Sequence, residues 1–242
     1  MPLRCLDLCC GTKSVREGLV ALYGESGVDY VGVDSNHRAQ PEILADLATW
    51  DYRAELTPGE FDVVWASPPC TEYSTAKGGH PRNLELADSI ASRCVEMILY
   101  LRPRVWFMEN PLHGMLKSRP FMSVMRPFLH RTTYCHYGRD FKKPTAIWSN
   151  RPGLSPRFCC RATPCEHKMT SVIHPACSQR GPRRGFARTT TREEVYKIPP
   201  LLLQELLSGI TSSQADHASG VPGMPGPSLT AREESEARRE MS

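Results

Sequence analysis

The sequence predicts an α/β fold, built on a doubly wound and mostly parallel sheet with helices on both of its faces. In the first 110 residues, short apolar segments alternate with segments whose apolar side chains repeat at helical spacing. Turns that contain Gly, Asp, Cys or Glu follow the apolar segments directly, as is typical of the carboxyl ends of parallel strands. The chain has 242 residues, of which 40% are hydrophobic, so it is long enough to bury a core of its own.

The first strand and the first helix are expected at residues 3–8 and 13–23. Residues 3–8 form a short apolar run that leads into the turn Cys-Cys-Gly-Thr. Val15, Leu19 and Leu22 follow at the spacing that places them on one face of a helix.

The next elements repeat this order of strand, turn and helix. Residues 29–33 predict a second strand, and residues 61–66 (Phe-Asp-Val-Val-Trp-Ala) predict a buried strand that leads into Ser-Pro-Pro-Cys. Residues 84–101 predict a helix, and residues 104–108 predict another strand, which Glu-Asn-Pro closes. Ligands of such sheets bind beyond the carboxyl ends of the strands, so these turns are the expected site.

The pattern changes after residue 130. Residues 132–137 and 144–148 predict a pair of strands, and residues 198–207 predict a helix that begins with prolines. Residues from 212 onward are rich in Ser, Gly, Pro, Glu and Arg, which is typical of disorder. The expected organisation is a core at 1–150, a basic Cys/His-rich insert at 151–192, a C-terminal helix packed on the core at 193–211 and a disordered tail at 212–242.

The charge is distributed unevenly along the chain. Residues 1–125 carry 12 Lys and Arg against 16 Asp and Glu, whereas residues 126–192 carry 14 against 2. Residues 193–242 carry 4 against 8, and the net charge of the whole chain is +4. A central block this basic favours a polyanionic partner such as nucleic acid over a merely solvated face.

The composition disfavours a membrane or secreted protein. No apolar run approaches the roughly 20 residues of a membrane span, and the start leads directly into a strand rather than a signal peptide. The ten cysteines include two adjacent pairs, which fit a reducing compartment better than a disulfide framework. We therefore expect an intracellular protein, nuclear if its host is a eukaryote.

The turn Asp7-Leu-Cys-Cys-Gly-Thr-Lys-Ser is a candidate nucleoside site. A strand that ends in Asp, followed by a tight Gly turn that opens a helix, allows close approach of a nucleoside to the backbone. Only Gly11 is present, so the pyrophosphate-binding glycine pattern is absent, which favours a nucleoside without phosphates, such as S-adenosylmethionine. Asp34 is expected to bind the ribose hydroxyls and Asp46 the adenine amino group. The alternative is an ordinary strand-to-helix turn.

Two further turns carry reactive side chains. Pro68 and Pro69 stiffen the chain before Cys70, so a thiolate at this strand end is a candidate nucleophile toward an electron-poor carbon; a structural cysteine is the alternative. Glu109 follows the apolar segment Trp-Phe-Met and is a candidate proton donor in a cleft, unless it only caps a surface turn.

The order of these motifs resembles that of the carbon-5 cytosine DNA methyltransferase family, which shows Asp-Leu-Phe-Cys-Gly, an acidic residue after strand two, Pro-Cys and Glu-Asn-Val. The match spans residues 3–112. The segment from Cys135 to Asn150, with Lys-Pro-Thr-Ala-Ile-Trp, and the later Ile198-Pro199 also look like a compact branch found in viruses and protists.

The resemblance implies a Rossmann-like, S-adenosylmethionine-dependent enzyme that methylates carbon 5 of cytosine in DNA. In this mechanism, the thiolate of Cys70 adds to carbon 6 of a flipped base, while Glu109 stabilises the ring. The implied cofactor-binding residues are Asp7, Leu8, Gly11, Thr12, Lys13, Ser14, Asp34, Asp46 and Pro68. Candidate DNA contacts in the basic insert are Arg180, Arg183, Arg184 and Arg188.

The sequence departs from the family pattern at several positions. Lys13-Ser14 stands where Gly-Gly is usual, and Thr71 stands where Gln follows the cysteine. The Gln-x-Arg-x-Arg motif is not evident, and the target-recognition region is reduced to about residues 150–192. These departures bear on sequence selectivity more than on chemistry, and a protein partner could complete target recognition.

Three other functions use the same residues. Amino-group DNA methyltransferases carry Ser-Pro-Pro followed by an aromatic residue, but Cys70 cannot stack on a base. A non-catalytic nucleic-acid-binding adaptor would explain the altered Lys13-Ser14, but it has no need of Cys70 and Glu109. RNA remains an alternative substrate, because contacts to the backbone charge do not separate it from DNA.

Six potential metal ligands lie within 19 residues of the insert: Cys159, Cys160, Cys165, His167, His174 and Cys177. A tetrahedral zinc ion would order a segment that has no core of its own, with Cys159, Cys165 and His174 as preferred ligands. Cys177 or His167 is expected to supply the fourth ligand. The spacing is not that of a standard zinc finger, and a mobile Arg-rich loop with incidental cysteines is the alternative.

Overall fold

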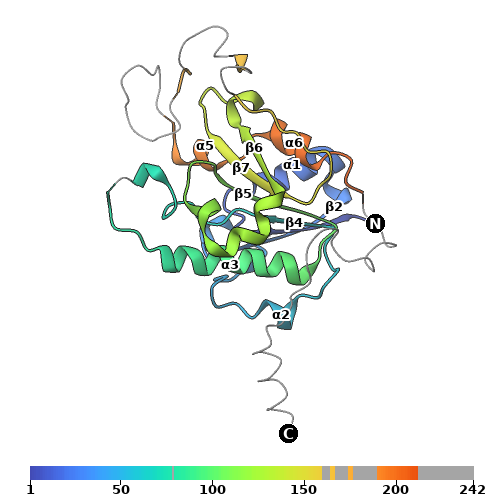
Figure 1. The fold of residues 1–242 in the computed structure, drawn as a ribbon. Coiled ribbons are helices and arrows are strands. Elements are labelled where there is room, and N and C mark those ends of the chain that lie inside the picture. Colours follow the sequence, from blue (N-terminus) through green and yellow to red (C-terminus); the bar gives the residue numbers. More distant parts are fainter. Residues whose placement is uncertain (78, 160–163, 167–173, 177–189, 212–242) are drawn as a thin grey trace.

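A mixed seven-stranded sheet forms the centre of the computed structural model, which describes the chain except residues 78, 160–163, 167–173, 177–189 and 212–242 (Figure 1). The strand order is β3-β2-β1-β4-β5-β7-β6. The first five strands run parallel, whereas β7 is antiparallel to both of its neighbours. The strands are β1 (Leu3–Leu8), β2 (Val28–Asp34), β3 (Ile43–Leu44), β4 (Val63–Ala66), β5 (Val105–Pro111), β6 (Leu129–Thr133) and β7 (Pro144–Ser149). The predicted doubly wound, mostly parallel sheet is confirmed.

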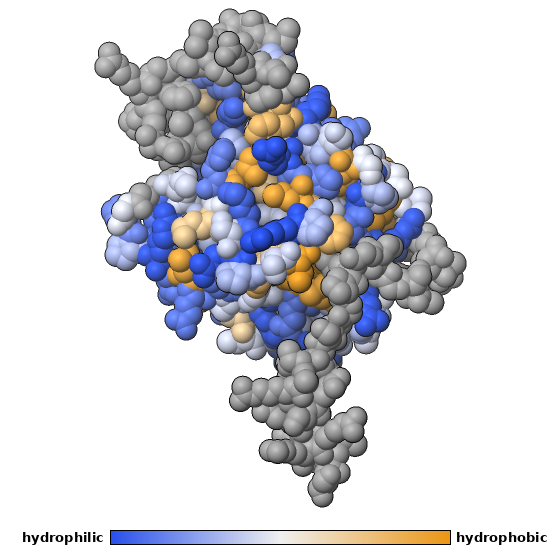
Figure 2. Space-filling model, in the orientation of Figure 1, coloured by the Kyte–Doolittle hydropathy of each residue, from blue (hydrophilic) through white to orange (hydrophobic). Residues whose placement is uncertain are grey.

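Helices cover both faces of this sheet. The α-helices are α1 (Ser14–Tyr23), α2 (Tyr52–Glu55), α3 (Leu84–Leu101), α5 (Arg192–Tyr196) and α6 (Pro200–Leu207). The chain also forms the 3₁₀ turns η1 (Glu25–Gly27), η2 (His37–Ala39), η3 (Thr75–Lys77), η4 (Leu116–Ser118), η5 (Pro120–Phe128) and η6 (Tyr134–Tyr137). In Figure 1, α3 lies on one face of the sheet, and α1 and α6 lie together on the other. None of the described helices is long and apolar enough to cross a membrane, and Figure 2 shows mostly hydrophilic side chains with scattered apolar ones on this side.

Successive residues of the central strands enter two separate hydrophobic clusters, because neighbouring side chains of a strand point to opposite faces. Trp106 of β5 belongs to the cluster beneath α3, whereas the next residue, Phe107, belongs to the cluster beneath α1 and α6. Both side chains are fully buried. This burial on both faces explains why the strands read as continuous apolar runs rather than as alternating ones.

α6 docks directly against α1, which brings the end of the described chain back to its beginning. Gly18 of α1 provides the space: a Cβ atom added there would lie 2.8 Å from Cβ of Leu203. The Tyr23 hydroxyl donates a hydrogen bond to the Leu207 carbonyl at 2.5 Å. The contact between these helices is therefore close-packed and specific.

The segment after β6 differs from the predicted strand at residues 132–137. The strand occupies Leu129–Thr133, and the chain then turns through the 3₁₀ turn η6, which Gly138 ends with a φ of 83°. Tyr134 and Tyr137 are both buried in the same cluster. A 3₁₀ turn places residues three apart on one side, whereas a strand would point these two side chains in opposite directions.

We predict that Gly18→Ala destabilises the protein, although alanine normally favours a helix by about 1 kcal/mol. The added methyl group overlaps the buried Leu203, so we expect a net loss of about 1–3 kcal/mol in the free energy of unfolding, measured by urea denaturation. Leu203→Ala removes the close contacts with Cδ1 and Cγ of Leu203, although it keeps Cβ, so it should cost less in the Gly18→Ala background than alone. A Gly18→Ala variant that is more stable than the wild type would contradict this packing of α6.

Candidate active site

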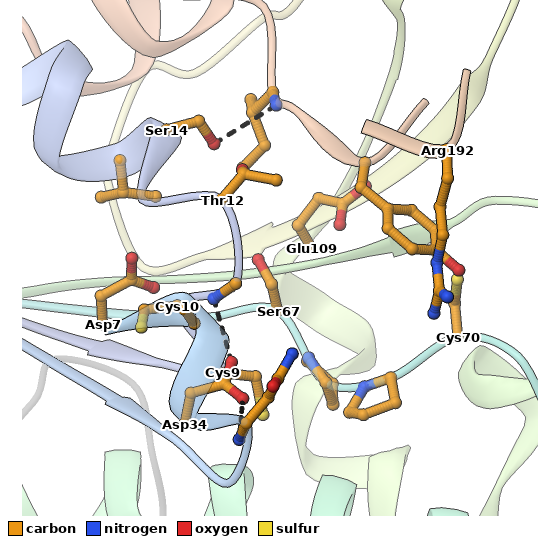
Figure 3. A pocket seen from close by; sticks show the side chains of 18 of the residues that line it. Asp7, Cys9, Cys10, Thr12, Ser14, Asp34, Ser67, Cys70, Glu109 and Arg192 are labelled. Carbon is orange, nitrogen blue, oxygen red and sulfur yellow. Dashed lines mark hydrogen bonds between the residues drawn. The ribbon is translucent and has the colours of Figure 1, made fainter. Parts of the chain in front are cut away.

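A cavity of about 510 Å³ opens at the carboxyl ends of β1, β2, β4 and β5. This is the edge of the sheet at which the sequence predicted a site. Figure 3 shows Asp7, Cys10 and Asp34 on one side of the cavity, and Cys70, Glu109 and Arg192 on the other. The cavity therefore has two ends with different chemistry, joined across the tips of β1 and β4.

The turn between β1 and α1 forms the wall of the first end. Cys9, Gly11 and Lys13 all adopt left-handed backbone conformations, with φ of 60°, 45° and 53°. For the two residues with a side chain, this conformation is unfavourable and is retained only where the surroundings fix it. The Cys10 amide donates to the Val33 carbonyl at 3.1 Å, and the Gly11 amide donates to Asp34 Oδ2 at 2.9 Å. The turn is thus held against the end of β2.

Asp7 contributes a buried carboxyl group to the same end. Its side chain is almost completely buried, and Oδ2 accepts a hydrogen bond from the Tyr30 hydroxyl at 2.7 Å. Oδ1 has no hydrogen-bond partner among the described residues. Burial raises the pKa of Asp7 to about 7, which the Tyr30 hydrogen bond only partly offsets. A buried carboxyl group with an open oxygen suits a cationic ligand.

The loop after β4 holds Cys70 at the second end. The Ser67 amide donates to the Leu8 carbonyl at 3.0 Å, so the loop begins in register with β1. The Asn110 side-chain amide then donates to the Pro68 carbonyl at 2.9 Å, and Asn110 itself is buried. Glu109, Asn110 and Pro111, expected to follow the strand, are its last residues, so the end of β5 fixes the Pro-Pro-Cys loop directly.

Glu109 lies in a buried polar cluster at this second end. Its Oε1 accepts a hydrogen bond from the Tyr134 hydroxyl at 3.2 Å and lies 3.5 Å from Lys143 Nζ. Lys143 is 8% exposed and donates to the Val195 carbonyl at 3.0 Å. It also lies over the Tyr134 ring, 4.5 Å from its centroid. A buried ammonium group is held here by a carboxylate, a carbonyl and a π face.

The charges around Cys70 act on its thiol in opposite directions. Burial raises the pKa of Cys70, and the negative charge of Glu109 raises it further. Lys143 and Arg192 lower the pKa, because a positive charge favours the thiolate. The two cations therefore favour the thiolate, which is the reactive form of this largely buried cysteine.

Most of the predicted catalytic and cofactor-binding residues line this cavity, but three of them do not. Those that line it are Asp7, Gly11, Thr12, Ser14, Asp34, Pro68, Cys70 and Glu109. Leu8 is buried in the core, and the Lys13 ammonium pairs with Glu42 at 2.9 Å. Asp46 is exposed and accepts a hydrogen bond from the Ala48 amide, so its carboxylate closes a local turn.

Four predicted DNA contacts, Arg180, Arg183, Arg184 and Arg188, lie outside the described residues. Two residues of the second end, Lys143 and Arg192, were not predicted from the sequence as site residues. Arg192 opens α5, where the Thr191 side chain and Glu194 form a capping box. The pattern Thr-x-x-Glu is a signal for that helix start, but it gives no hint that the helix lies at the cavity.

We predict that Asp7→Asn stabilises the protein in a pH-dependent way. The folded state raises the pKa of Asp7 above its unfolded value near 4, so it favours the protonated acid, and this contribution is lost as the pH rises through about 7. Asn is neutral at every pH, so its advantage should be small near pH 4 and reach about 2–4 kcal/mol near pH 8. Urea denaturation of both proteins across this range measures the difference. A difference that does not change with pH would contradict the raised pKa.

Comparisons with known proteins agree with this geometry. The chain is 30% identical over 226 residues to the "Probable DNA (cytosine-5)-methyltransferase" of Frog virus 3 (isolate Goorha), a match that covers 85% of this chain and 99% of the relative. No family model matches the chain.

Two solved structures are similar in part. One is a DNA modification methyltransferase encoded within an E. coli prophage, with 14% identity and a TM-score of 0.43, and the other is the methyltransferase EhMeth of Entamoeba histolytica, with 12% identity and a TM-score of 0.44. They match 61% and 62% of this chain, which spans 46% and 52% of theirs. On the strength of the viral relative, which it matches over nearly its whole length, this chain belongs to the DNA (cytosine-5)-methyltransferase family.

Proposed function

We propose that this protein transfers a methyl group from S-adenosylmethionine to carbon 5 of cytosine in DNA, through a covalent bond between Cys70 and carbon 6 of the base. The observation that carries the proposal is the two-ended cavity, with a nucleoside-type turn at one end and a cysteine with a buried carboxylate at the other. An enzyme of this kind needs a donor and a base to meet, and this cavity offers a place for each.

The first end fits S-adenosylmethionine. The molecule carries positive charges on its sulfur and its amino group, and the open Oδ1 of the buried Asp7 is a partner for a cation. Asp34 lines the same end, and although its carboxylate accepts backbone hydrogen bonds from Gly11 and Asn36, each oxygen retains capacity for a hydroxyl group. When bound, S-adenosylmethionine supplies a methyl group on an electron-poor sulfur.

The second end fits the chemistry of the base. Carbon 5 of cytosine is a weak nucleophile until a thiolate adds to carbon 6, which is the role of Cys70. The carboxyl group of Glu109 donates a proton to the endocyclic nitrogen, which takes up the electron pair displaced by the addition, and it accepts a hydrogen bond from the exocyclic amine. Carbon 5 then gains the methyl group, and S-adenosylhomocysteine is left as the by-product. A water molecule takes the proton from carbon 5, the double bond between carbons 5 and 6 reforms, and the bond between sulfur and carbon 6 breaks. Cys70 is thereby regenerated.

The substrate must be presented as a single base. Carbon 6 is inaccessible within a stacked duplex, so the cytosine has to leave the helix at a cost of a few kcal/mol. Contacts to the phosphate backbone supply binding free energy for this step. The basic stretch of residues 126–192 includes Lys143 and Arg192, which both line the cavity.

We expect Cys70→Ala to abolish methyl transfer to DNA, with a rate at least about 10⁴-fold below that of the wild type, because no other group at this end can add to the ring. Nucleoside mass spectrometry of the digested DNA distinguishes 5-methylcytosine from products methylated on the amino group. Cys94→Ala is the matched control, since Cys94 is a buried cysteine of α3 that does not line the cavity.

Three outcomes of this assay would contradict the proposal. A Cys70→Ala variant that retains methyl transfer would exclude the covalent step, and an amino-methylated product would assign the protein to the amino-group enzymes. If the wild type binds S-adenosylmethionine but methylates only RNA of the same sequence, the substrate is RNA rather than DNA.

We expect Lys143→Met to make Cys70 less reactive at neutral pH. Loss of the ammonium group removes the largest influence that lowers the pKa of the thiol, so the pH midpoint of its alkylation by iodoacetamide should rise. Mass spectrometry of the peptide that contains Cys70 measures the rate of alkylation at each pH. The neighbouring Lys142→Met is the control, and equal midpoints in the two variants would show that Lys143 does not act on the thiol.

A further inference from the structure

Four metal-ligand side chains meet outside the cavity. The ligand atoms of Cys135, Cys159, Cys165 and His174 all lie within 4.8 Å of one another, and all four residues are buried. They come from three separate segments, since Cys135 belongs to η6, Cys159 and Cys165 follow β7, and His174 lies further along the insert. The clustering is therefore a product of the fold rather than of a short sequence motif.

The chemistry of this group suits a tetrahedral zinc ion. Ligands at the usual distances of about 2.3 Å for sulfur and 2.0–2.1 Å for nitrogen surround zinc at mutual separations of about 3.5–3.8 Å. Cys165 Sγ and His174 Nε2 are already 3.1 Å apart, and the Cys165 amide lies 3.4 Å from Cys159 Sγ. A disulfide would use only two of the three thiols and leave a thiol and an imidazole buried in the same small space. One metal ion uses all four groups.

The surroundings point to a structural role for such an ion. Cys135, Cys159 and Cys165 form a buried cluster of their own, separate from the two large clusters of the sheet. Hydrogen bonds also join the described residues beside these ligands to the core, such as the one from the Cys159 amide to Thr133 Oγ1 at 2.8 Å and the one from the Ala176 amide to the Asp140 carbonyl at 3.1 Å. A segment with little apolar core gains stability from a metal ion.

We propose that Cys135, Cys159, Cys165 and His174 bind one zinc ion with four protein ligands, which fastens the basic insert to the η6 turn. In this set Cys135 is the fourth ligand; Cys177 and His167, which the sequence suggested for that place, lie outside the described residues. Cys135 lies 24 positions before Cys159, so no local spacing could indicate it. A closed set of four protein ligands leaves no open position for catalysis at the metal.

The proposed zinc site lies in the basic segment that is expected to bind DNA. Residues 151–192 contain nine Lys and Arg against one acidic residue, and the metal would fix this segment at its two described cysteines and at His174. Cys135 directly follows Tyr134, whose hydroxyl group contacts Glu109. The metal therefore holds the basic segment against the same turn that supports the second end of the cavity.

Metal analysis of the purified full-length chain tests the proposal without any assay of methyl transfer. We expect about one zinc ion per chain, and an X-ray absorption spectrum of the wild type that reports three sulfur ligands and one nitrogen ligand. Cobalt exchanged into the site should give the visible absorption bands of a tetrahedral thiolate site. Less than about 0.1 equivalent of zinc, together with no cobalt spectrum under reducing conditions, would overturn the proposal.

Variants then test the ligand set. Cys135→Ser and Cys165→Ser should each lose most of the bound zinc, whereas Cys5→Ser, which changes a buried cysteine of β1 outside the cluster, should retain it. A Cys135→Ser protein with a full equivalent of zinc and an unchanged cobalt spectrum would remove Cys135 from the set. If either variant fails to fold, the absorption spectrum of the wild type still decides the ligand count.

Removal of zinc by a chelator tests the role of the ion. We expect DNA affinity to fall at least about tenfold while the affinity for S-adenosylmethionine changes less than twofold, because the metal lies outside the cavity. Unchanged DNA affinity in the metal-free protein would overturn the fastening role. The zinc and binding measurements do not depend on methyl transfer or on Cys70. The zinc proposal and the proposed function can therefore fail independently of each other.

Discussion

The parallel pairing of β4 with β5 is the constraint on which the candidate active site depends. It brings the ends of the two strands to the same edge of the sheet, so the Pro-Pro-Cys loop and the Glu-Asn-Pro turn become neighbours although they lie about forty residues apart. The buried hydrogen bond from the Asn110 side chain to the Pro68 carbonyl then joins the two turns. Because the loop and the end of β5 are fixed to each other, Cys70 and Glu109 are held at one end of a cavity whose other end is built on β1 and β2.

Electrostatic balance at the second end follows from burial. Burial and the negative charge of Glu109 both raise the pKa of the Cys70 thiol and so favour its neutral form. Lys143 offsets this, because its ammonium group pairs with Glu109 and also acts on Cys70. The Tyr134 ring and the Val195 carbonyl keep that ammonium group in place. The connection between β6 and β7, the antiparallel pair at the edge of the sheet, thus supplies a positive charge that acts on Cys70.

Local pattern in the sequence was sufficient where an element depends on its own residues. The bounds of α3 agree with the apolar repeat of residues 84–101, and Cys70 and Glu109 were found because reactive side chains directly follow apolar strands. Residues whose surroundings are formed by parts of the chain far away in the sequence were not predicted. Lys143 and Cys135 read as parts of a hairpin, and only the tertiary fold brings one to Glu109 and the other to a Cys/His cluster. Asp46 does not line the cavity, and its carboxylate accepts a hydrogen bond from the amide two residues ahead, as Asp side chains readily do in turns; its contact with adenine stays a prediction.

Covalent trapping tests the central claim most directly. Duplex DNA that contains 5-fluorocytosine is incubated with the protein and S-adenosylmethionine, and the denatured mixture is digested and analysed by mass spectrometry. Fluorine cannot leave carbon 5 as a proton does, so the account predicts an adduct that persists through denaturation and maps to Cys70. The absence of any adduct, from a protein shown to bind both S-adenosylmethionine and DNA, would contradict it.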